Sequence, residues 1–553
     1  MNACTDVVIV GGGLAGLSLA IQLRLRDPSL QVVVLERNAH PVREAAFKVG
    51  ESTVEIGAHY FAHVLGLRAE LDAEQISKFG FRFFFSEGRE DIDQCAELGV
   101  SEILTTPSWQ LDRGRFENLL GERARALGVD FRDRCTVRGF ELGEGDALHH
   151  VRYEDQGQPR ELSARWLIDA AGRAGLVKRK LGLAEANAHN ANAVWWRVDG
   201  LIDPNDWSDD ASWLRRCTPP DRWRSTNHMC GSGYWFWLIP LASGAHSLGI
   251  VCDADAHPLE SMNTHAKAMA WLQTHQPRVA RSLEHGEHAL KDFMFLRDFS
   301  YGCKQVFSAD RWALTGEAGV FLDPLYSPGS DFIAISNGYI SELIARDRAG
   351  QRFESYVDLY QQLYFSFYAN TLTLYQDQYA LLGDAQVMPL KIMWDYTLYW
   401  ALLAPLFFAD RLTHIGILGR LRDSFTLATD LNTAMQPLLR EWGQRNAEEG
   451  GIAQERTDDR LLDQRVIGWF AEMNRALNDQ LDDEALVERI RANVVLLRAL
   501  AVELLDQAKL EHPQIEGLPL QLVLQRDATS RADAASAPTL LSPLWYAAEP
   551  VAA

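Results

Sequence analysis

The sequence lacks the cysteine and histidine spacings that are typical of metal sites. Its seven cysteines are scattered singly through 553 residues, and no CxxC pair occurs. An odd number of isolated cysteines in a long chain indicates reduced thiols rather than a disulfide framework. We therefore predict no structural metal and a cytoplasmic location.

Positive charge is also scarce. The chain carries 54 Lys and Arg against 75 Asp and Glu, for a formal net charge of −21. Phosphate contacts require clustered Lys and Arg, so this balance argues against nucleic acid as a partner. It weakly disfavours docking on an anionic membrane or an acidic carrier protein, although a local basic patch would override that.

Long apolar runs are absent as well. The best membrane candidate, residues 396–409, is shorter than a bilayer span and is interrupted by Pro405. Asp395 and Asp410 flank it. We predict a buried helix and no stable membrane insertion. The N-terminus carries no basic segment of the kind that opens a signal peptide, so none is expected.

The pattern of apolar residues near the N-terminus predicts a βαβ unit of about thirty residues. Val7–Val10 and Val32–Leu35 are short apolar strands, and a helical pattern lies between them. Strand-like and helical pieces continue to mix until about residue 340. The first 340 residues therefore predict an α/β module of the Rossmann-like type.

Three further segments differ in composition. Residues 176–300 show the aromatic alternation of an inserted β-sheet, which we assign to the substrate region. Residues 341–526 have helical spacing and predict a helical C-terminal domain. Residues 527–553 are rich in Ala, Ser and Pro and predict a disordered tail.

A glycine-rich turn follows the first strand and predicts a dinucleotide site. "GGGLAG" supplies Gly11, Gly13 and Gly16, with Ala15 inside the motif. The first glycine permits the turn, the second lets the backbone approach a pyrophosphate, and the third lets helix and strand pack closely. Glu36 ends the second strand, where a carboxylate accepts hydrogen bonds from ribose.

Three later segments resemble the FAD-contacting segments of the flavin monooxygenase superfamily. They are "DRGRF", which contains Arg113, "LIDAAGR", which contains Asp169 and Gly172, and "GEAGVFLDP", which contains Glu317. The resemblance implies FAD rather than NAD as the cofactor. Glu317 stands where the superfamily has an aspartate that holds the ribityl chain, and its extra methylene still permits that hydrogen bond.

Four more segments resemble the flavin-dependent halogenases. They are "VGEST" (49–53), "KFGFRF" (78–83), "WFWLIP" (235–240) and "FLDPLYSPG" (321–329), which fits the family's F-x-x-P-x-x-S-x-G pattern. The resemblance implies an enzyme that takes reduced FAD from a separate flavin reductase. It also implies that oxygen and chloride or bromide become hypohalous acid, which then halogenates a small aromatic substrate.

The W-x-W-x-I-P motif lies beside the flavin in that family. The resemblance therefore implies that Trp235 and Trp237, with Ile239 and Pro240, form a wall. Two indoles there would exclude an aromatic substrate from the flavin but leave room for a halide ion. The alternative is ordinary core packing of a Trp-rich strand.

A lysine is the place where oxidant and substrate meet in the family, and Lys78 matches it through "KFGFRF". Its ammonium can polarise hypohalous acid, or its neutral amine can become a haloamine. Burial among phenylalanines would lower its pKa and favour the second route. Lys48 is the rival by proximity in the sequence, and either lysine can instead be a solvated surface residue.

Tyr326 marks one departure from the family pattern. Tryptophan-directed members carry a glutamate at this position, just before the serine of the loop, and that carboxylate works with the lysine. Because this loop carries Tyr326 instead, the resemblance implies a phenol or pyrrole rather than tryptophan as the substrate.

The halide site shows a second departure. In the family, backbone N–H groups of the two residues after Ser327 hold the halide. Here Pro328 has no N–H, so the expected donors shift to Gly329 and Ser330. Locally the segment predicts a helix start with Ser327 as N-cap and Pro328 at the first helical position.

Two other functions fit parts of the pattern. One is a single-component FAD-dependent aromatic hydroxylase that uses NAD(P)H, although no second dinucleotide motif follows Glu36. The other is a flavin-binding scaffold without turnover. The missing N–H of Pro328 favours this function, whereas the retention of Lys78 and of the Trp235 and Trp237 pair argues against it. Neither the substrate, the preferred halide nor the oligomeric state follows from the sequence.

Overall fold

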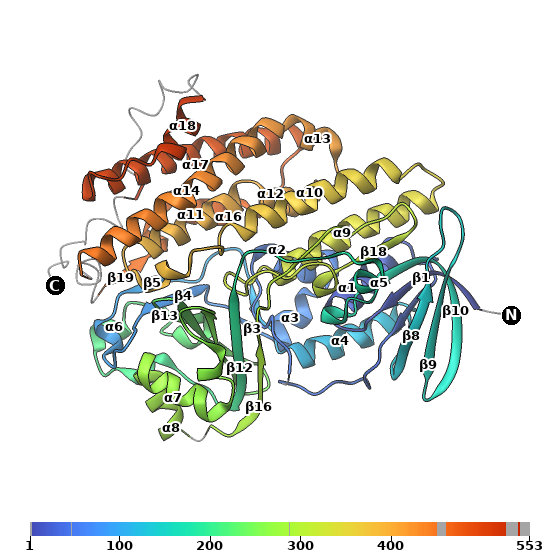
Figure 1. Cartoon of the computed structure of the whole chain (residues 1–553), viewed down its shortest axis with the longest axis horizontal. Helices are drawn as coiled ribbons and strands as arrows, with labels where there is room; N and C mark the ends of the chain where they lie inside the picture. Colours follow the sequence, from blue (N-terminus) through green and yellow to red (C-terminus); the bar gives the residue numbers. More distant parts are fainter. Residues whose placement is uncertain (1–2, 46, 287, 451–459, 527–539, 542–553) are drawn as a thin grey trace.

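The structure is a computed structural model that describes residues 3–45, 47–286, 288–450, 460–526 and 540–541. Two large β-sheets lie side by side, and a layer of long helices covers them (Figure 1). Two short two-stranded sheets, at residues 76–110 and 184–303, accompany them. This is the α/β architecture with a helical C-terminal region that the sequence predicts.

The first sheet has the predicted βαβ unit at its centre. β1 (Ala3–Val10) pairs in parallel with β2 (Val32–Leu35) on one side and with β10 (Gln158–Asp169) on the other. The remaining strands are β7 (Asp130–Arg132), β8 (Cys135–Glu141), β9 (His149–Asp155) and β18 (Trp312–Leu314). All four residues of β2 are buried and all are β-branched or leucine, as befits a strand covered on both faces.

Helices pack beside this sheet. α1 (Leu14–Arg26) follows β1, and α4 (Arg113–Ala126) packs against it. Asp112 caps α4, because its side chain accepts hydrogen bonds from the N–H groups of Gly114 and Arg115.

The second sheet contains strands from residues 176–300, for which the sequence predicts a β-sheet, but it also includes strands from residues 81–99 and 461–463 outside that range. Its eight strands are β4 (Phe81–Phe85), β5 (Glu97–Gly99), β12 (Ala191–Asp199), β13 (Thr226–Gly231), β14 (Tyr234–Pro240), β15 (Ala245–Asp253), β16 (Leu290–Leu296) and β19 (Leu461–Asp463). On β14, Trp235 and Trp237 belong to the main core, whereas Tyr234 and Phe236 face a second core under α7 (His265–His275). The strand therefore separates two apolar layers.

Several shorter elements connect the main strands and helices. They are α2 (Glu55–His59), the π-helical turn η1 (Tyr60–Val64), α3 (Arg68–Glu74), β3 (Ile76–Ser77), β6 (Trp109–Gln110), the 3-10 turn η3 (Gly172–Ala174), α5 (Leu176–Leu181), α6 (Ala211–Leu214), α8 (Pro277–His285) and the 3-10 turn η7 (Gly316–Ala318).

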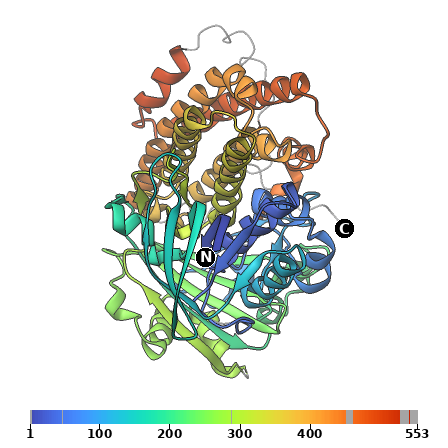
Figure 2. The same ribbon diagram turned by 90° about the vertical axis from the view of Figure 1, so that its right-hand side faces the viewer.

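The helical layer begins with α9 (Gly329–Arg348), which lies over α1 (Figure 2). It continues with α10 (Glu354–Leu372), α11 (Val387–Ala401), α12 (Leu403–Phe408), α13 (Ile415–Arg420), α14 (Arg422–Glu448), α16 (Gly468–Ala476), α17 (Asp483–Glu511) and α18 (Leu518–Arg526). β19 crosses from this layer to pair with β5, so the helical region is joined to the second sheet.

The apolar run at 396–409 forms the end of α11 and all of α12, and most of it is buried. Over the ranges that the structure describes, no helix has both the length and the apolar character to cross a bilayer. The predicted tail at 527–553 lies outside the described residues, apart from 540–541.

Candidate functional site

The three motif glycines meet different surroundings. A Cβ on Gly11 would lie 2.3 Å from the carbonyl oxygen of Ala170, and one on Gly16 would lie 2.0 Å from that of Gly11. Both glycines are therefore required by the packing of the protein itself. A Cβ on Gly13 would meet no atom within 4 Å. Gly13 thus borders open space at the N-terminus of α1, where the motif places a pyrophosphate.

Glu36 directly follows β2 and closes the same site. Its carboxylate accepts hydrogen bonds from the N–H groups of Gly12 at 2.8 Å and Asn38 at 2.7 Å. These bonds fix the side chain beside the glycine turn, in the position from which an acid accepts hydrogen bonds from ribose.

Distant segments complete this nucleotide site. Ala15 packs against the turn that carries Glu317, because a Cβ on Gly316 would lie 2.9 Å from the Cβ of Ala15. Burial raises the pKa of Glu317, and the guanidinium groups of Arg173 and Arg113 oppose that rise. A carboxylate flanked by two cations beside a helix N-terminus suits the polar middle of FAD, so the residues present fit this cofactor.

Asp169 and Gly172 lie on the loop that follows β10. The carboxylate of Asp169 is fully buried and accepts hydrogen bonds from the N–H groups of Ala171 at 3.0 Å and Val177 at 2.7 Å. Both oxygens are thus engaged within the protein, so Asp169 positions the loop. Gly172 has a φ of 58° and begins η3.

The predicted tryptophan wall lies on the face of β14 that is turned to the main core. Trp235 is 2% exposed and Trp237 5% exposed, and their ring centroids are 5.7 Å apart. The Trp235 indole donates to the Tyr379 hydroxyl, and the Trp237 indole donates to Ser247. Ile239 and Pro240 continue the strand and are buried. Each indole is therefore fixed in orientation as well as buried.

Lys78 lies on the same aromatic surface. Its Nζ is buried, donates to Ser52 Oγ at 2.9 Å and to the Thr53 carbonyl at 3.0 Å, and lies 3.4 Å from the centroid of the Phe81 ring. The His228 ring lies 5.3 Å from that of Phe81 and 5.3 Å from that of Trp235. A continuous row of rings thus connects the lysine to the tryptophan wall.

Burial lowers the pKa of Lys78 to about 7, while the carboxylates of Glu55 and Asp331 act in the opposite direction. Burial also lowers the pKa of His228 to about 3, so this ring is neutral at physiological pH. Near neutrality Lys78 therefore exchanges between ammonium and amine.

Lys48, the rival lysine, lies elsewhere. It forms an ion pair with Glu117, and a third of its side chain is exposed to solvent. Glu117 also pairs with Arg113 at 2.7 Å, so Lys48 belongs to the charged surroundings of the nucleotide site.

Lys78 lines a small cavity, here called the lysine cavity, of about 30 Å³. Such a volume accommodates roughly two water-sized molecules. Its lining comprises Val54, Glu55, Lys78, Gly80, Phe81, Phe83, Val100, Leu104, Thr106, Ser108, Ile392, Tyr396, Trp400, Gln464 and Phe470.

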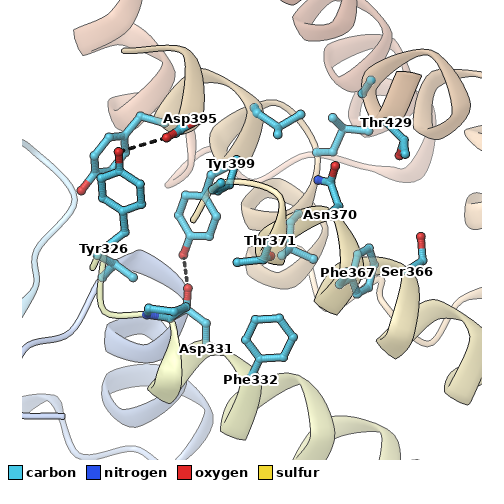
Figure 3. A pocket seen from close by; sticks show the side chains of 18 of the residues that line it. Tyr326, Asp331, Phe332, Ser366, Phe367, Asn370, Thr371, Asp395, Tyr399 and Thr429 are labelled. Carbon is cyan, nitrogen blue, oxygen red and sulfur yellow. Dashed lines mark hydrogen bonds between the residues drawn. The ribbon is translucent and has the colours of Figure 1, made fainter. Parts of the chain in front are cut away.

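A second cavity, here called the helical-domain cavity, has about 110 Å³ and lies beyond Val54 and Tyr396, which line both (Figure 3). Its surface is mainly apolar. The other lining residues are Tyr326, Pro328, Asp331, Phe332, Ser366, Phe367, Asn370, Thr371, Leu374, Tyr375, Asp395, Leu398, Tyr399, Leu402, Leu403, Phe425, Ala428 and Thr429.

Two hydrogen bonds order the polar end of this cavity, and both are drawn in Figure 3. The Tyr326 hydroxyl donates to Asp395 at 3.0 Å, and the Tyr399 hydroxyl donates to Asp331 at 2.7 Å. Burial raises the pKa of Asp331 to about 7. The tyrosine that replaces the loop glutamate is therefore itself bonded to a carboxylate, which comes from α11.

The start of α9 differs from the sequence prediction. The helix begins at Gly329, and Ser327, expected as its N-cap, lies outside it with a left-handed φ of 54°. The predicted cap is wrong because Tyr326 and Ser327 both adopt positive φ to turn the chain, which directs the serine away from the helix. Pro328 precedes the helix and Gly329 and Ser330 begin it, so their N–H groups belong to its unpaired first turn.

Sequence patterns missed Glu55, Asp331 and Trp400, which the fold brings beside Lys78 or its cavity. The available signal for Glu55 was a single acid inside the apolar segment "STVEIGAHYF". Such an acid indicates a buried partner only once the fold supplies one.

Comparison with known proteins identifies an FAD binding domain and relatives that are flavin-dependent halogenases. A family profile described as "FAD binding domain" matches residues 4–289. Flavin-dependent halogenase chlA of Dictyostelium discoideum is 26% identical over 439 residues, which is 72% of this chain and 70% of that protein. The 1H-pyrrole-2-carbonyl-(peptidyl-carrier protein) brominase of Pseudoalteromonas luteoviolacea is 27% identical over 331 residues, 59% of this chain and 74% of that one.

A solved structure shares the fold over most of the chain. The crystal structure of halogenase PltM in complex with phloroglucinol and FAD has a TM-score of 0.61 and 18% sequence identity. The similarity covers 88% of this chain and 96% of that one, so it extends through the helical layer.

Proposed function

This chain belongs to the flavin-dependent halogenases, which are built on an FAD binding domain, and we propose that it halogenates a phenol- or pyrrole-type ring. It is an FAD-dependent enzyme of the oxidoreductase type. The proposal rests on the position of Lys78, which is buried in a small cavity and joined by a row of rings to Trp235. A single-component hydroxylase is not favoured, because the relatives described above are halogenases.

The residues at the nucleotide site would hold FAD through the glycine turn, Glu36, Arg113 and Glu317. Bound in its reduced form, FAD supplies the electrons with which oxygen and a halide ion become hypohalous acid. Since no second dinucleotide motif follows Glu36, a separate flavin reductase in transient contact supplies reduced FAD. All seven cysteines are free, which supports a cytoplasmic location.

The halide is assigned to the start of α9. Pro328 offers no N–H, but the N–H groups of Gly329 and Ser330 open a 20-residue helix whose dipole favours an anion. Pro328 also lines the helical-domain cavity, so this helix start borders the substrate side. The tryptophan wall keeps the aromatic substrate away from the flavin and leaves the oxidant to travel to Lys78.

The helical-domain cavity takes the aromatic substrate. Its described lining contains no Lys or Arg, and its ionisable acids are Asp331 and Asp395. A substrate carboxylate would be buried there without a cation, which is costly. A neutral ring with a hydroxyl or pyrrole N–H suits the tyrosine and carboxylate groups at the polar end. The ligands named for two of the similar proteins, a pyrrole carbonyl and phloroglucinol, are electron-rich rings of this kind.

We therefore expect free tryptophan to remain unmodified while a neutral phenol is brominated. The assay supplies reduced FAD, oxygen and bromide and reads the product by mass spectrometry. Two phenols of similar size test the effect of a negative charge on the substrate. The neutral 4-ethylphenol should react at least about a hundredfold faster than 4-hydroxyphenylacetate, which carries a carboxylate. Efficient bromination of tryptophan, or equal rates for the two phenols, would contradict this substrate class.

A further inference from the structure

Glu55 and Trp400 present unpaired polar atoms in the lysine cavity. Glu55 is 7% exposed, and its Oε2 has no hydrogen-bond partner among the described residues. The indole nitrogen of Trp400, whose side chain is 1% exposed, is also without one. Buried polar atoms are nearly always hydrogen-bonded. Two such atoms without a partner in one cavity therefore indicate that a small molecule binds there.

The two groups face each other without closing a hydrogen bond. Burial raises the pKa of Glu55, and a hydrogen-bonding contribution from the Trp400 indole is among the causes that oppose this rise. The indole N–H is therefore directed toward the carboxylate, yet the geometry of a direct bond is not reached. A small molecule beside them, within reach of both atoms, would complete the hydrogen bonding of each.

The orientation of Glu55 is fixed by a distant helix. The side-chain amide of Asn474, on α16, donates to Glu55 Oε1 at 3.2 Å. The amide oxygen of Asn474 accepts a hydrogen bond from the backbone N–H of Thr106 at 3.0 Å. Rotating the amide by 180° would break this bond, so the NH2 group stays directed at Glu55. One carboxylate oxygen is thus held by the protein and the other is left for the cavity.

Lys78 is the third hydrogen-bonding group of the lysine cavity, beside Glu55 and Trp400. An ammonium has three hydrogens, of which two are directed to Ser52 Oγ and the Thr53 carbonyl. The cavity therefore offers N–H donors from Lys78 and Trp400 and an acceptor from Glu55. A molecule that matches it has one oxygen that both accepts and donates, and it is no larger than roughly two water molecules.

We propose that Glu55 is the second catalytic group of halogenation, and that Glu55, Lys78 and Trp400 together hold hypohalous acid in the lysine cavity. This inference rests on the proposed function, which supplies the oxidant. The oxygen of hypohalous acid accepts from the ammonium and the indole, and its O–H donates to Glu55. The halogen is then directed at the boundary with the helical-domain cavity, at Val54 and Tyr396, where the ring lies.

The reaction step balances with these groups alone. A π electron pair of the ring attacks the halogen, and the halogen–oxygen bond breaks with both electrons going to oxygen. The Lys78 ammonium gives that oxygen a proton, which makes water. The ring carbon loses its own proton to the Glu55 carboxylate, restoring the aromatic ring, and Glu55 then returns this proton to the Lys78 amine.

Other titratable groups face this pair. They are Asp331 on α9, His228 on β13, and Tyr396 and Tyr399 on α11. Burial keeps the tyrosines and His228 neutral at physiological pH. Asp331 already accepts from Gly57 N–H and Tyr399, so Glu55 is the carboxylate with a free oxygen.

The test replaces Glu55 with an amide of the same shape. Glu55→Gln should bind FAD and reoxidise reduced FAD as the wild type does, yet halogenate about 10²–10⁴-fold more slowly. Trp400→Phe removes the indole N–H together with part of the ring, and it should slow halogenation about tenfold. Asp384→Asn alters a half-buried carboxyl outside the cavity and should halogenate as the wild type does. Halogenation at wild-type rates by both Glu55→Gln and Trp400→Phe would overturn the proposal.

A second readout does not depend on turnover. The Lys78 pKa, followed by NMR of 13C-lysine-labelled protein and assigned by the signal lost in Lys78→Ala, should fall in Glu55→Gln because a neighbouring negative charge is removed. If the wild type makes no halogenated product, the proposed function fails. In that case the titration alone decides whether Glu55 is paired with Lys78. A lower Lys78 pKa in Glu55→Gln supports the pairing, and an unchanged Lys78 pKa overturns it.

Discussion

Lys78→Ala is expected to bind FAD and reoxidise reduced FAD normally while losing halogenation by about 10²–10⁴-fold. The reason is spatial: Lys78 lies in the lysine cavity against Phe81, whereas the groups assigned to FAD lie around Gly13 and Glu36. Oxidant formation and its use are thus carried by different residues. Stopped-flow absorbance measures the first, and mass spectrometry of the aromatic product measures the second.

The matched control is Lys48→Ala. Lys48 pairs with Glu117 at the edge of the nucleotide site, so its loss should leave substrate halogenation intact once FAD is saturating. If Lys78→Ala instead halogenates at the wild-type rate and Lys48→Ala does not, the catalytic role moves to Lys48.

The pH dependence of the same reaction identifies the form of Lys78 that acts. Its pKa is lowered to about 7, so the ammonium is lost as pH rises through neutrality. A lysine that donates a proton gives a halogenation rate that falls above about pH 7, and Lys78→Ala removes this alkaline limb. A haloamine route needs the neutral amine and predicts the opposite slope.

Gly13→Val is expected to fold normally and to bind FAD at least about a hundredfold more weakly, which corresponds to roughly 2.7 kcal/mol. A Cβ at Gly13 meets no protein atom within 4 Å, and the backbone there has φ −88°, which any residue adopts. The valine therefore disturbs the space for the pyrophosphate and little else. Equilibrium titration with FAD measures the affinity, and circular dichroism confirms the fold.

A glycine far from the site provides the control for that substitution. A Cβ at Gly416, on α13, would likewise meet no atom within 4 Å, and Gly416→Val should bind FAD as the wild type does. Unchanged FAD affinity in a well-folded Gly13→Val protein would show that the glycine turn does not hold the pyrophosphate.

The nucleotide site is the part that the sequence predicts best, because it is local. The glycine turn and Glu36 lie within one βαβ unit, and the geometry of that unit follows from short-range rules. Lys78 and the Trp235 strand were predicted by their resemblance to a family, and the structure brings them onto one row of rings.

The partners of Lys78 could not be predicted in that way. Glu55 is held by Asn474, which is 419 positions away, so only the complete fold brings them together. Trp400 comes from the helical region, where periodicity predicts a helix but not the wall of a particular cavity.

The helix start at Gly329 shows how tertiary contacts override a local rule. "SPGSD" has the composition of a capped helix, yet Tyr326 is tied to Asp395 on another helix and the chain turns through left-handed backbone before α9 begins. The resulting backbone path determines which N–H groups are available to an anion. This path cannot be predicted from the composition of the segment alone.

The central claim, that the reduced flavin is used to halogenate and not to hydroxylate, is tested most directly by the mass of the product. The protein is mixed with enzymatically reduced FAD, oxygen, bromide and a neutral phenol. We predict a product with the paired isotope peaks of bromine, which disappears without bromide and in Lys78→Ala. A hydroxylated phenol as the main product, with or without bromide, would contradict the account.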